Sequence, residues 1–301
     1  MNFNFSRYVS VAFSVVLVCA LSDLASAKSE HAAADDSARH TNQGVKFARD
    51  KQYEKAIAEF TKAIEQEPND PKNYENRALV YRLTGKPEQA LGDLTKLIEL
   101  RPKDAKAYSS KGEIEVQQGK LDPAINDLTR AIELDPGDAN IRRYRGYAFL
   151  QKQDWKKAVE DYSIVIERST DDVAAHEQRG SAYRSLGKYP EAVADFTKVI
   201  EARPKDAEAF RRRGLTYRLM QDYAKAADDF RTLLQLKPND ADAQSRLNYV
   251  EAKLYSVHPA PFTPIPHQAA EEAVRNAHAG TVVGQQAQRQ PAPTSTPSPA
   301  E

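Results

Sequence analysis

The sequence predicts an all-α protein, a right-handed α-solenoid of six helix-turn-helix repeats followed by a C-terminal capping helix. Alanine recurs every 34 residues, and aspartate and proline recur with the same period. Such a period means that copies of one small unit stack on one another. The alanine series is Ala56, Ala90, Ala124, Ala158, Ala192 and Ala226. The aspartate series is Asp36, Asp70, Asp104, Asp138, Asp172, Asp206 and Asp240. The proline series is Pro68, Pro102, Pro136, Pro204 and Pro238, with Thr170 in the remaining place.

Each unit contains two amphipathic segments. Residues 56–64 place apolar side chains at the i, i+3, i+4, i+7 spacing of one helix face. In the fifth copy, residues 174–186 form the preceding helix, and Gly187 and Pro190 separate the two. Proline is well placed there, because a helix's first turn leaves its N–H groups unpaired anyway. The periodic aspartate stands just before each first helix, so we expect it to accept a hydrogen bond from a first-turn N–H.

Further series of small and aromatic residues share the period. Glycine recurs in the first helix at Gly44, Gly112, Gly146, Gly180 and Gly214, with Ala78 once in its place. Aromatic places include Tyr74, Tyr108, Phe210, Phe47, Tyr81, Phe149, Tyr183, Tyr217, Phe60, Phe196 and Phe230. With the proline near each unit's end, these features resemble the tetratricopeptide repeat. The resemblance divides the chain into copies 37–70, 71–104, 105–138, 139–172, 173–206 and 207–240.

Three residues depart from the family pattern. Glu115 and Arg142 occupy places that usually hold aromatic side chains, and Thr170 replaces a proline. One interpretation is drift in a tolerant repeat. The other is a softer joint in the third and fourth copies that flexes on binding.

The two ends of the chain differ from the repeats. Residues 1–27 have Arg7, an apolar run and Ala25-Ser26-Ala27, which predicts a secretory signal peptide cleaved after Ala27. A short linker, residues 28–36, would follow. The alternative is that residues 8–22 remain as a membrane anchor. Residues 241–256 predict a capping helix, and the Pro-, Ala- and Gln-rich residues 257–301 predict a disordered tail.

Composition argues against several classes of function. The 43 basic and 43 acidic residues balance, which argues against nucleic acid as a partner. Cys19 is the only cysteine, so the mature chain would have no disulfide or thiolate site. No histidine pair has helical metal-site spacing, and His176 replaces an aromatic core residue. Phosphate-loop and nucleophile motifs are absent. The periodic carboxylates, such as Asp161 and Asp195, are interpreted as a solvated helix face or as pairs between repeats. We therefore expect no cofactor, no metal and no enzymatic activity.

The resemblance implies that the first helices line a concave groove that binds another protein. Carried over by position, the candidate binding residues are Lys72, Arg82, Arg143, Tyr147, Arg184, Arg211, Leu215 and Arg218. Arginine favours a protein or peptide partner of acidic character, because its planar group binds carboxylates with two hydrogen bonds. The alternative is that these arginines are solvated or pair with Glu75, Glu113 and Glu177. Thr41, Val45 and Ser110 stand where a clamp for a terminal carboxylate needs other residues, which argues against that specialisation.

These observations predict an exported, periplasmic, non-enzymatic scaffold that binds a partner segment in its groove. The alternative function is a membrane-anchored structural subunit of an envelope or secretion complex. Contact with a membrane is expected only if the signal is retained.

Overall fold

The computed structural model describes residues 34–257, and all regular structure in that range is helical. The first helix, α1, includes residues 34–49. Helices α2 to α13 span, in order, Tyr53–Gln66, Pro71–Leu83, Pro87–Leu100, Ala105–Gln117, Leu121–Leu134, Ala139–Gln151, Trp155–Arg168, Val173–Ser185, Tyr189–Ala202, Ala207–Leu219, Tyr223–Leu236 and Ala241–Val257. The predicted signal peptide and tail lie outside the described residues, apart from Val257, which ends α13.

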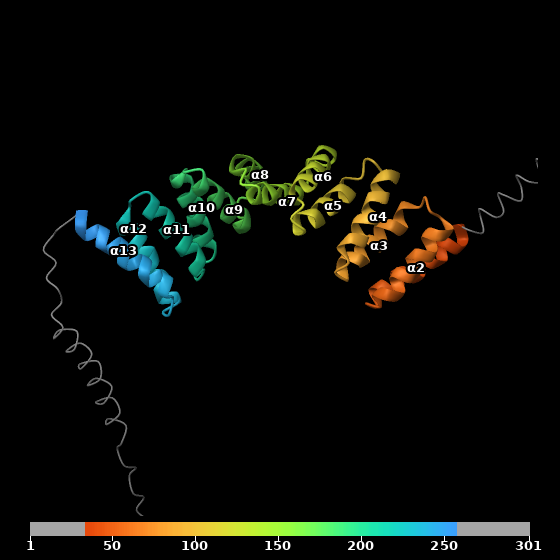
Figure 1. Ribbon diagram of the computed structural model, residues 1–301, viewed down its shortest axis with the longest axis horizontal. Helices are drawn as coiled ribbons and strands as arrows, with labels where there is room; N and C mark the ends of the chain where they lie inside the picture. The colour runs from red at the N-terminus through yellow and green to blue at the C-terminus, as the bar shows by residue number, and fades with distance from the viewer. Residues whose placement is uncertain (1–33, 258–301) are drawn as a thin grey trace, which may run out of the picture.

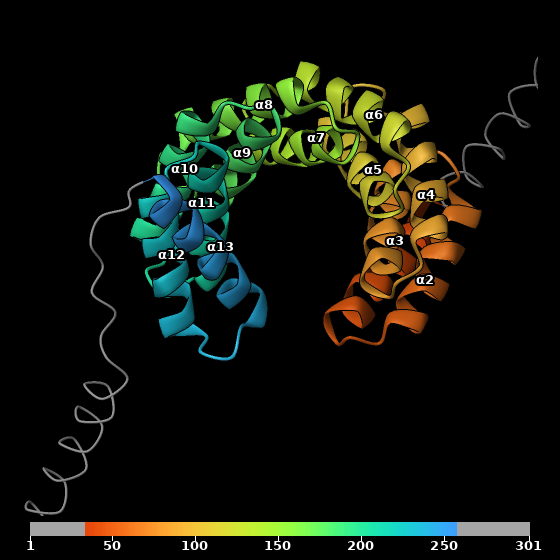
Figure 2. The same cartoon turned by 60° about the vertical axis from the view of Figure 1, so that its left-hand side comes forward.

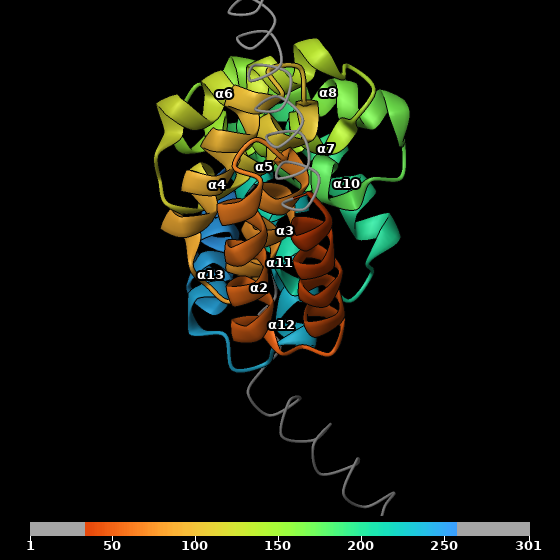
Figure 3. The ribbon, with the colours of Figure 1, turned by 90° about the vertical axis from the view of Figure 1, so that its right-hand side faces the viewer.

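The helices stack in chain order into a curved, two-layered solenoid (Figure 1). Figure 2 shows α3, α5, α7, α9, α11 and α13 on the inside of an arch and the even-numbered helices outside. The end view in Figure 3 shows α2 and α3 in front, with the later repeats behind them. The first helix of each repeat therefore contributes to the inner surface, as the family resemblance implies.

Five members of the aspartate series cap the first helix of a repeat. Asp70, Asp104, Asp138, Asp172 and Asp206 each accept a hydrogen bond from a backbone N–H two or three residues later. Asp240 does the same at the start of α13 through the Ala243 N–H, at 3.0 Å. Asp36 is different, because α1 already includes residue 34. The cap expected at Asp36 is therefore wrong, and residues 34–36 of the expected linker are helical.

The turn between the two helices of each repeat requires one residue with positive φ. These residues also recur every 34 positions, and glycine fills only half of the places. They are Lys51 (58°), Gly85 (68°), Gly119 (72°), Gln153 (62°), Gly187 (73°) and Gln221 (62°). Side chains other than glycine are strained there, so three of the six turns are locally less favourable.

Small residues allow the two helices of a repeat to approach closely. All six alanines of the series are fully buried. A Cβ on Gly112 would lie 2.7 Å from Leu128 Cγ, closer than side-chain atoms normally come. The equivalent position on Gly44 would lie 2.7 Å from Phe60 Cε1. The periodic small residues are thus required by packing.

The periodic carboxylates are buried, which corrects the expectation of a solvated face. Asp93, Asp161, Asp195 and Asp229 are at most 6 % exposed. Each accepts two hydrogen bonds from an arginine on the first helix of the same repeat, at 2.7–3.0 Å; the arginines are Arg77, Arg145, Arg179 and Arg213. A third guanidinium bond reaches a hydroxyl of the preceding repeat, on Thr61, Thr129, Ser163 or Thr197. These four arginine–aspartate pairs therefore lie within repeats, and the same arginines reach the preceding repeat through the hydroxyl bonds.

Candidate partner-binding groove

The inner surface exposes apolar side chains among its polar ones. On α3, Leu79 and Leu83 are 52 % and 60 % exposed. On α7, Tyr147 is 44 % exposed, and on α13, Tyr249 is 46 % exposed. Exposed leucine and tyrosine side chains on a curved face provide contact area for another chain.

One pocket lies at the N-terminal end of this groove, between α3 and α5. Its volume is about 190 Å³ and its lining includes Leu79, Arg82 and Lys106. Arg82 is already paired, because its Nη2 donates to Glu113 Oε2 at 2.6 Å. Lys72, at the start of α3, is exposed and makes no ion pair within the described part of the chain.

A second pocket, of about 270 Å³, lies between α7 and α9 and has an aromatic lining. Tyr144, Tyr147 and Tyr162 contribute to it, together with Arg143 and Gln178. The Tyr144 hydroxyl donates to Glu113 Oε1 at 2.6 Å, and this carboxylate raises the pKa of Tyr144 to about 12. Arg143 pairs with Asp172, the cap of the next repeat. The structure thus brings Arg143 and Tyr147 together in one pocket.

Arg184 and Arg218 have no carboxylate partner among the described residues. Arg82, by contrast, donates hydrogen bonds to Ser110, 28 residues later, and to Glu113, 31 residues later, and Glu113 neutralises its charge. At the same two distances along the chain, Arg184 is followed by Arg212 and Leu215. Arg218 is followed in the same way by Arg246 and Tyr249, so neither arginine has a carboxylate at the place of Glu113.

Arg184 and Arg218 instead lie against aromatic rings. The guanidinium carbons are 5.9 Å from the Phe196 ring centre and 5.7 Å from that of Tyr249, respectively. Burial and the neighbouring Arg212 lower the pKa of Arg184, and the charge of Glu208 offsets only part of this effect. A cation that is partly desolvated and lies near another cation favours an anion as its next neighbour.

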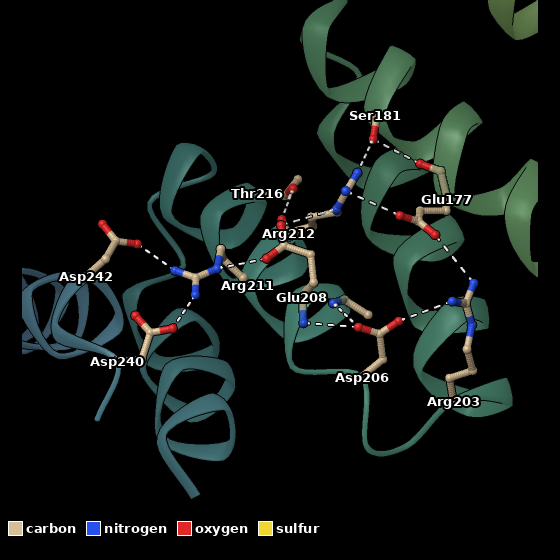
Figure 4. A network of polar contacts seen from close by, with 11 residues as sticks. Glu177, Ser181, Arg203, Asp206, Glu208, Arg211, Arg212, Thr216, Asp240 and Asp242 are labelled. Atoms are coloured by element: carbon tan, nitrogen blue, oxygen red, sulfur yellow. Dashed lines mark hydrogen bonds and ion pairs between the residues drawn. The ribbon is translucent and has the colours of Figure 1, made fainter. Parts of the chain in front are cut away.

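Arg211 and Arg212 belong to a network that joins α9, α11 and α13 (Figure 4). Arg211 contacts three carboxylates, those of Glu208, Asp240 and Asp242. Arg212 donates to Ser181 Oγ at 3.2 Å and pairs with Glu177 Oε1 at 3.3 Å. These two arginines are compensated within the protein, so they are less available to a ligand than Arg184 and Arg218.

The remaining predicted residue, Leu215, is half-buried and packs against the core of the last repeat. The alternative of internal pairing thus holds for part of the arginine set. Arg82 pairs with Glu113, and Glu75 and Glu177 pair with Arg101 and Arg203.

Sequence reasoning missed Leu83, Tyr144, Tyr162, Gln178 and Tyr249. The position of a residue within the repeat predicts which face of the helix it occupies. It does not predict where the side chains of neighbouring helices, such as that of the small Ala174, border a pocket.

The described residues, 34–257, were compared with the requirements of a membrane-spanning helix and of a metal site. Within this range no helix is both long and apolar enough to cross a bilayer. The same residues contain no group of three or more His, Cys, Asp or Glu side chains arranged to hold a metal ion.

Comparisons with known proteins agree with the fold. Sequence models described as "Tetratricopeptide repeat" match residues 178–241, 59–92 and 47–70, and one described as "TPR repeat" matches residues 112–153. No curated protein matches the chain significantly in sequence.

Solved structures that are similar to this chain include two with 26 % sequence identity. The first is YrrB, described as a TPR protein with an unusual peptide-binding site; the match has a TM-score of 0.58 and covers 62 % of this chain and 96 % of YrrB. The second is MamA, with a TM-score of 0.55 and coverage of 58 % and 95 %. MamA from Desulfovibrio magneticus RS-1, at 19 % identity, has a TM-score of 0.54 over 57 % of this chain and 97 % of its own, and shows the fold alone. The repeat period, the helix-pair stack and these matches agree, and the chain belongs to the tetratricopeptide repeat family.

Proposed function

We propose that this protein is an exported, non-enzymatic scaffold that binds an acidic, extended segment of another protein along its inner surface. The observation that carries the proposal is the lack of a carboxylate partner at Arg184 and Arg218 (within residues 34–257), on neighbouring inner helices. A partner's carboxylates would supply the missing acceptors. The tyrosine-lined pocket between α7 and α9 would receive an apolar side chain of the same segment.

Similarity to YrrB supports a peptide ligand, since its description names a peptide-binding site. The similarity does not specify where this chain binds. The two arginines without carboxylate partners and the tyrosine pocket support a site on the inner surface.

Affinity capture with two reversed charges tests the acidic partner. In the double variant Arg184→Glu and Arg218→Glu, two attractions become repulsions, so we expect capture of the partner from envelope extract to fall at least tenfold. The matched control is Lys156→Glu with Lys205→Glu, since both lysines are exposed and neither makes an ion pair in the described structure. Circular dichroism should show equal helicity in all three proteins. Equal capture by the two double variants would exclude the arginine surface.

The mass of the mature protein tests export. Cleavage after Ala27 gives a chain that begins at Lys28, whereas a retained anchor gives one that begins at Met1. The second result would favour the alternative function, a membrane-anchored subunit of an envelope or secretion complex.

A further inference from the structure

Arg142 occupies a place that holds a ring in the five other repeats. The equivalent residues are His40, Tyr74, Tyr108, His176 and Phe210. Two of these rings donate to the backbone carbonyl six residues earlier. The Tyr74 hydroxyl donates to Pro68 O at 3.0 Å. His176 Nε2 donates to Thr170 O, also at 3.0 Å. An arginine here therefore replaces a packed ring that has a defined hydrogen-bond acceptor.

Arg142 makes no hydrogen bond to the corresponding acceptor. The carbonyl six residues earlier belongs to Pro136, and Arg168 Nη2 already donates to it at 2.8 Å. The Arg142 side chain is only 14 % exposed, its Nε is buried without a partner, and it makes no hydrogen bond with the described residues. A buried N–H group without an acceptor is costly, because it loses its bond to water without replacing it.

The nearest carboxylate, Asp161, already binds another arginine. Arg145 Nε and Nη2 donate to its two oxygens at 2.9 and 2.7 Å. Arg142 Nη1 lies 3.7 Å from Asp161 Oδ1, too far for a hydrogen bond. Two guanidinium groups thus share one buried carboxylate, which leaves a positive charge beside Asp161 without an acceptor.

A pocket of about 370 Å³ opens at Arg142, between α6, α7 and α8. Ile125, Phe149 and Ile164 give it apolar walls. Lys157 and Glu160 also line it, but the Lys157 ammonium pairs with Asp154 at 3.0 Å. This pocket shares no lining residue with the two groove pockets, so it is a separate site.

We propose that this pocket binds an organic carboxylate, with the anionic group on Arg142 and the hydrocarbon part against Ile125, Phe149 and Ile164. A carboxylate has the acceptor geometry that a guanidinium matches with two parallel hydrogen bonds. The apolar walls favour a ligand with a hydrocarbon body over a bare inorganic anion. A free carboxylic acid and a glutamate side chain of a partner share this chemistry.

Titration of the full-length protein, followed by NMR of the arginine Nε–H groups, tests the site. The first probe is hexanoate, and hexan-1-ol is its uncharged control. The second probe is the blocked peptide acetyl-Leu-Glu-Leu-amide. We expect hexanoate to shift the Arg142 Nε–H resonance in a saturable manner, with at least tenfold weaker binding of hexan-1-ol. Binding by hexanoate alone identifies a small-molecule site, and binding by the peptide as well identifies a site open to a protein side chain.

The variant Arg142→Tyr restores the ring found in the second and third repeats. It should fill the pocket, keep or raise the melting temperature and abolish hexanoate binding. Arg231→Gln, which removes the same charge from an exposed pair on α12, should leave binding unchanged. Glu160→Gln should strengthen binding severalfold, because it removes a like charge from the lining. Arg145 also lines the pocket, so its Nε–H resonance reports binding in the variant that lacks Arg142. Unchanged affinity in Arg142→Tyr, or no saturable shift by either probe in the natural sequence, would overturn the proposal.

Discussion

At the scale of single residues, the main finding is a repeated buried ion pair between the two helices of a repeat. In the second, fourth, fifth and sixth repeats an arginine holds a buried aspartate with two hydrogen bonds and lies 5.6–5.9 Å from an aromatic ring four residues later. In the third repeat, both the arginine and the aromatic residue of this contact are replaced. Lys111 replaces the arginine and pairs with Glu115, which replaces the ring, at 3.1 Å.

Removal of one partner of a buried pair should be far more damaging than removal of a surface pair. Asp229 is 4 % exposed and binds Arg213, whereas its neighbour Asp228 is exposed and binds Arg231. We expect Asp229→Ala to lower the free energy of unfolding by about 3–5 kcal/mol, since Arg213 would be left without its counter-charge. Asp228→Ala should cost less than about 1 kcal/mol. Urea unfolding of both variants at pH 7 checks the difference, and similar losses would show that burial does not set the cost.

Glu115 should make the stability of the protein depend on pH. Burial raises the pKa of Glu115 above its ordinary value of 4.5, and its Oε2 has no hydrogen-bond partner. A raised folded-state pKa means that the contribution of this group is most favourable below about pH 4.5 and is lost as the pH rises through the folded-state value. Glu115→Gln should therefore stabilise the protein by about 1 kcal/mol at pH 7 and have little effect at pH 4. Urea unfolding at both pH values measures this, and a gain that is equal at both would contradict it.

At the scale of elements, each repeat depends on a turn whose residue has positive φ. Gly85, Gly119 and Gly187 adopt this conformation without strain, whereas Lys51, Gln153 and Gln221 do not. The sequence shows the glycine places but not that the other three turns adopt the same conformation. The backbone conformation of the turn therefore recurs in every repeat, whereas the glycine recurs in only half of them.

Glycine should improve two of the strained turns. We expect Gln153→Gly and Gln221→Gly each to raise the free energy of unfolding by about 1 kcal/mol, because they remove the contact between Cβ and the backbone at positive φ. The reverse change Gly187→Gln is the matched control and should lower stability by a similar amount. Thermal unfolding of the three variants decides the sign, and destabilisation by both glycine changes would show that the side chains of Gln153 and Gln221 make compensating contacts.

At the scale of the whole molecule, repeats contact mainly their neighbours, so stability is expected to vary along the stack. The ion pairing of the inner-surface arginines also differs along the stack. Arg82 is neutralised near one end, whereas Arg184 and Arg218 lack carboxylate partners near the other, as far as residues 34–257 are concerned.

Local opening should be most frequent in the third and fourth repeats. Four buried side-chain atoms without a hydrogen-bond partner lie there, on Glu115, Gln118, Arg142 and Arg143, against two in residues 173–240, on Arg212 and Arg218. We expect amide hydrogen exchange to be at least tenfold faster in residues 105–172 than in residues 173–240, because unsatisfied buried groups lower the cost of local unfolding. Equal protection of the two ranges would support drift in a tolerant repeat instead of a softer joint.

Most of the fold was predictable because its contacts recur with the sequence period. Ala124, Gly112 and Asp104 have the predicted structural roles, since each is required by a contact that nearly every repeat makes. Asp36 shows the limit of this reasoning, because α1 already includes residue 34 and Asp36 lies inside the helix.

The candidate site was less predictable. Arg184 and Arg82 occupy the same place in their repeats, yet only Arg82 has an acceptor. The difference lies in residues of the next repeat, such as Glu113 and Leu215, which do not follow the period.

The sequence by itself therefore determined the repeat, its two helices, their caps and the inner layer, because these depend on residues that every copy keeps. The tertiary structure alone decided which charges are compensated. It showed that the periodic carboxylates are buried within repeats, that Arg184 and Arg218 have no carboxylate partner in the described chain, and that a pocket opens beside Arg142. Ion pairing depends on which side chains of neighbouring copies meet across an interface, and a linear period does not specify that geometry.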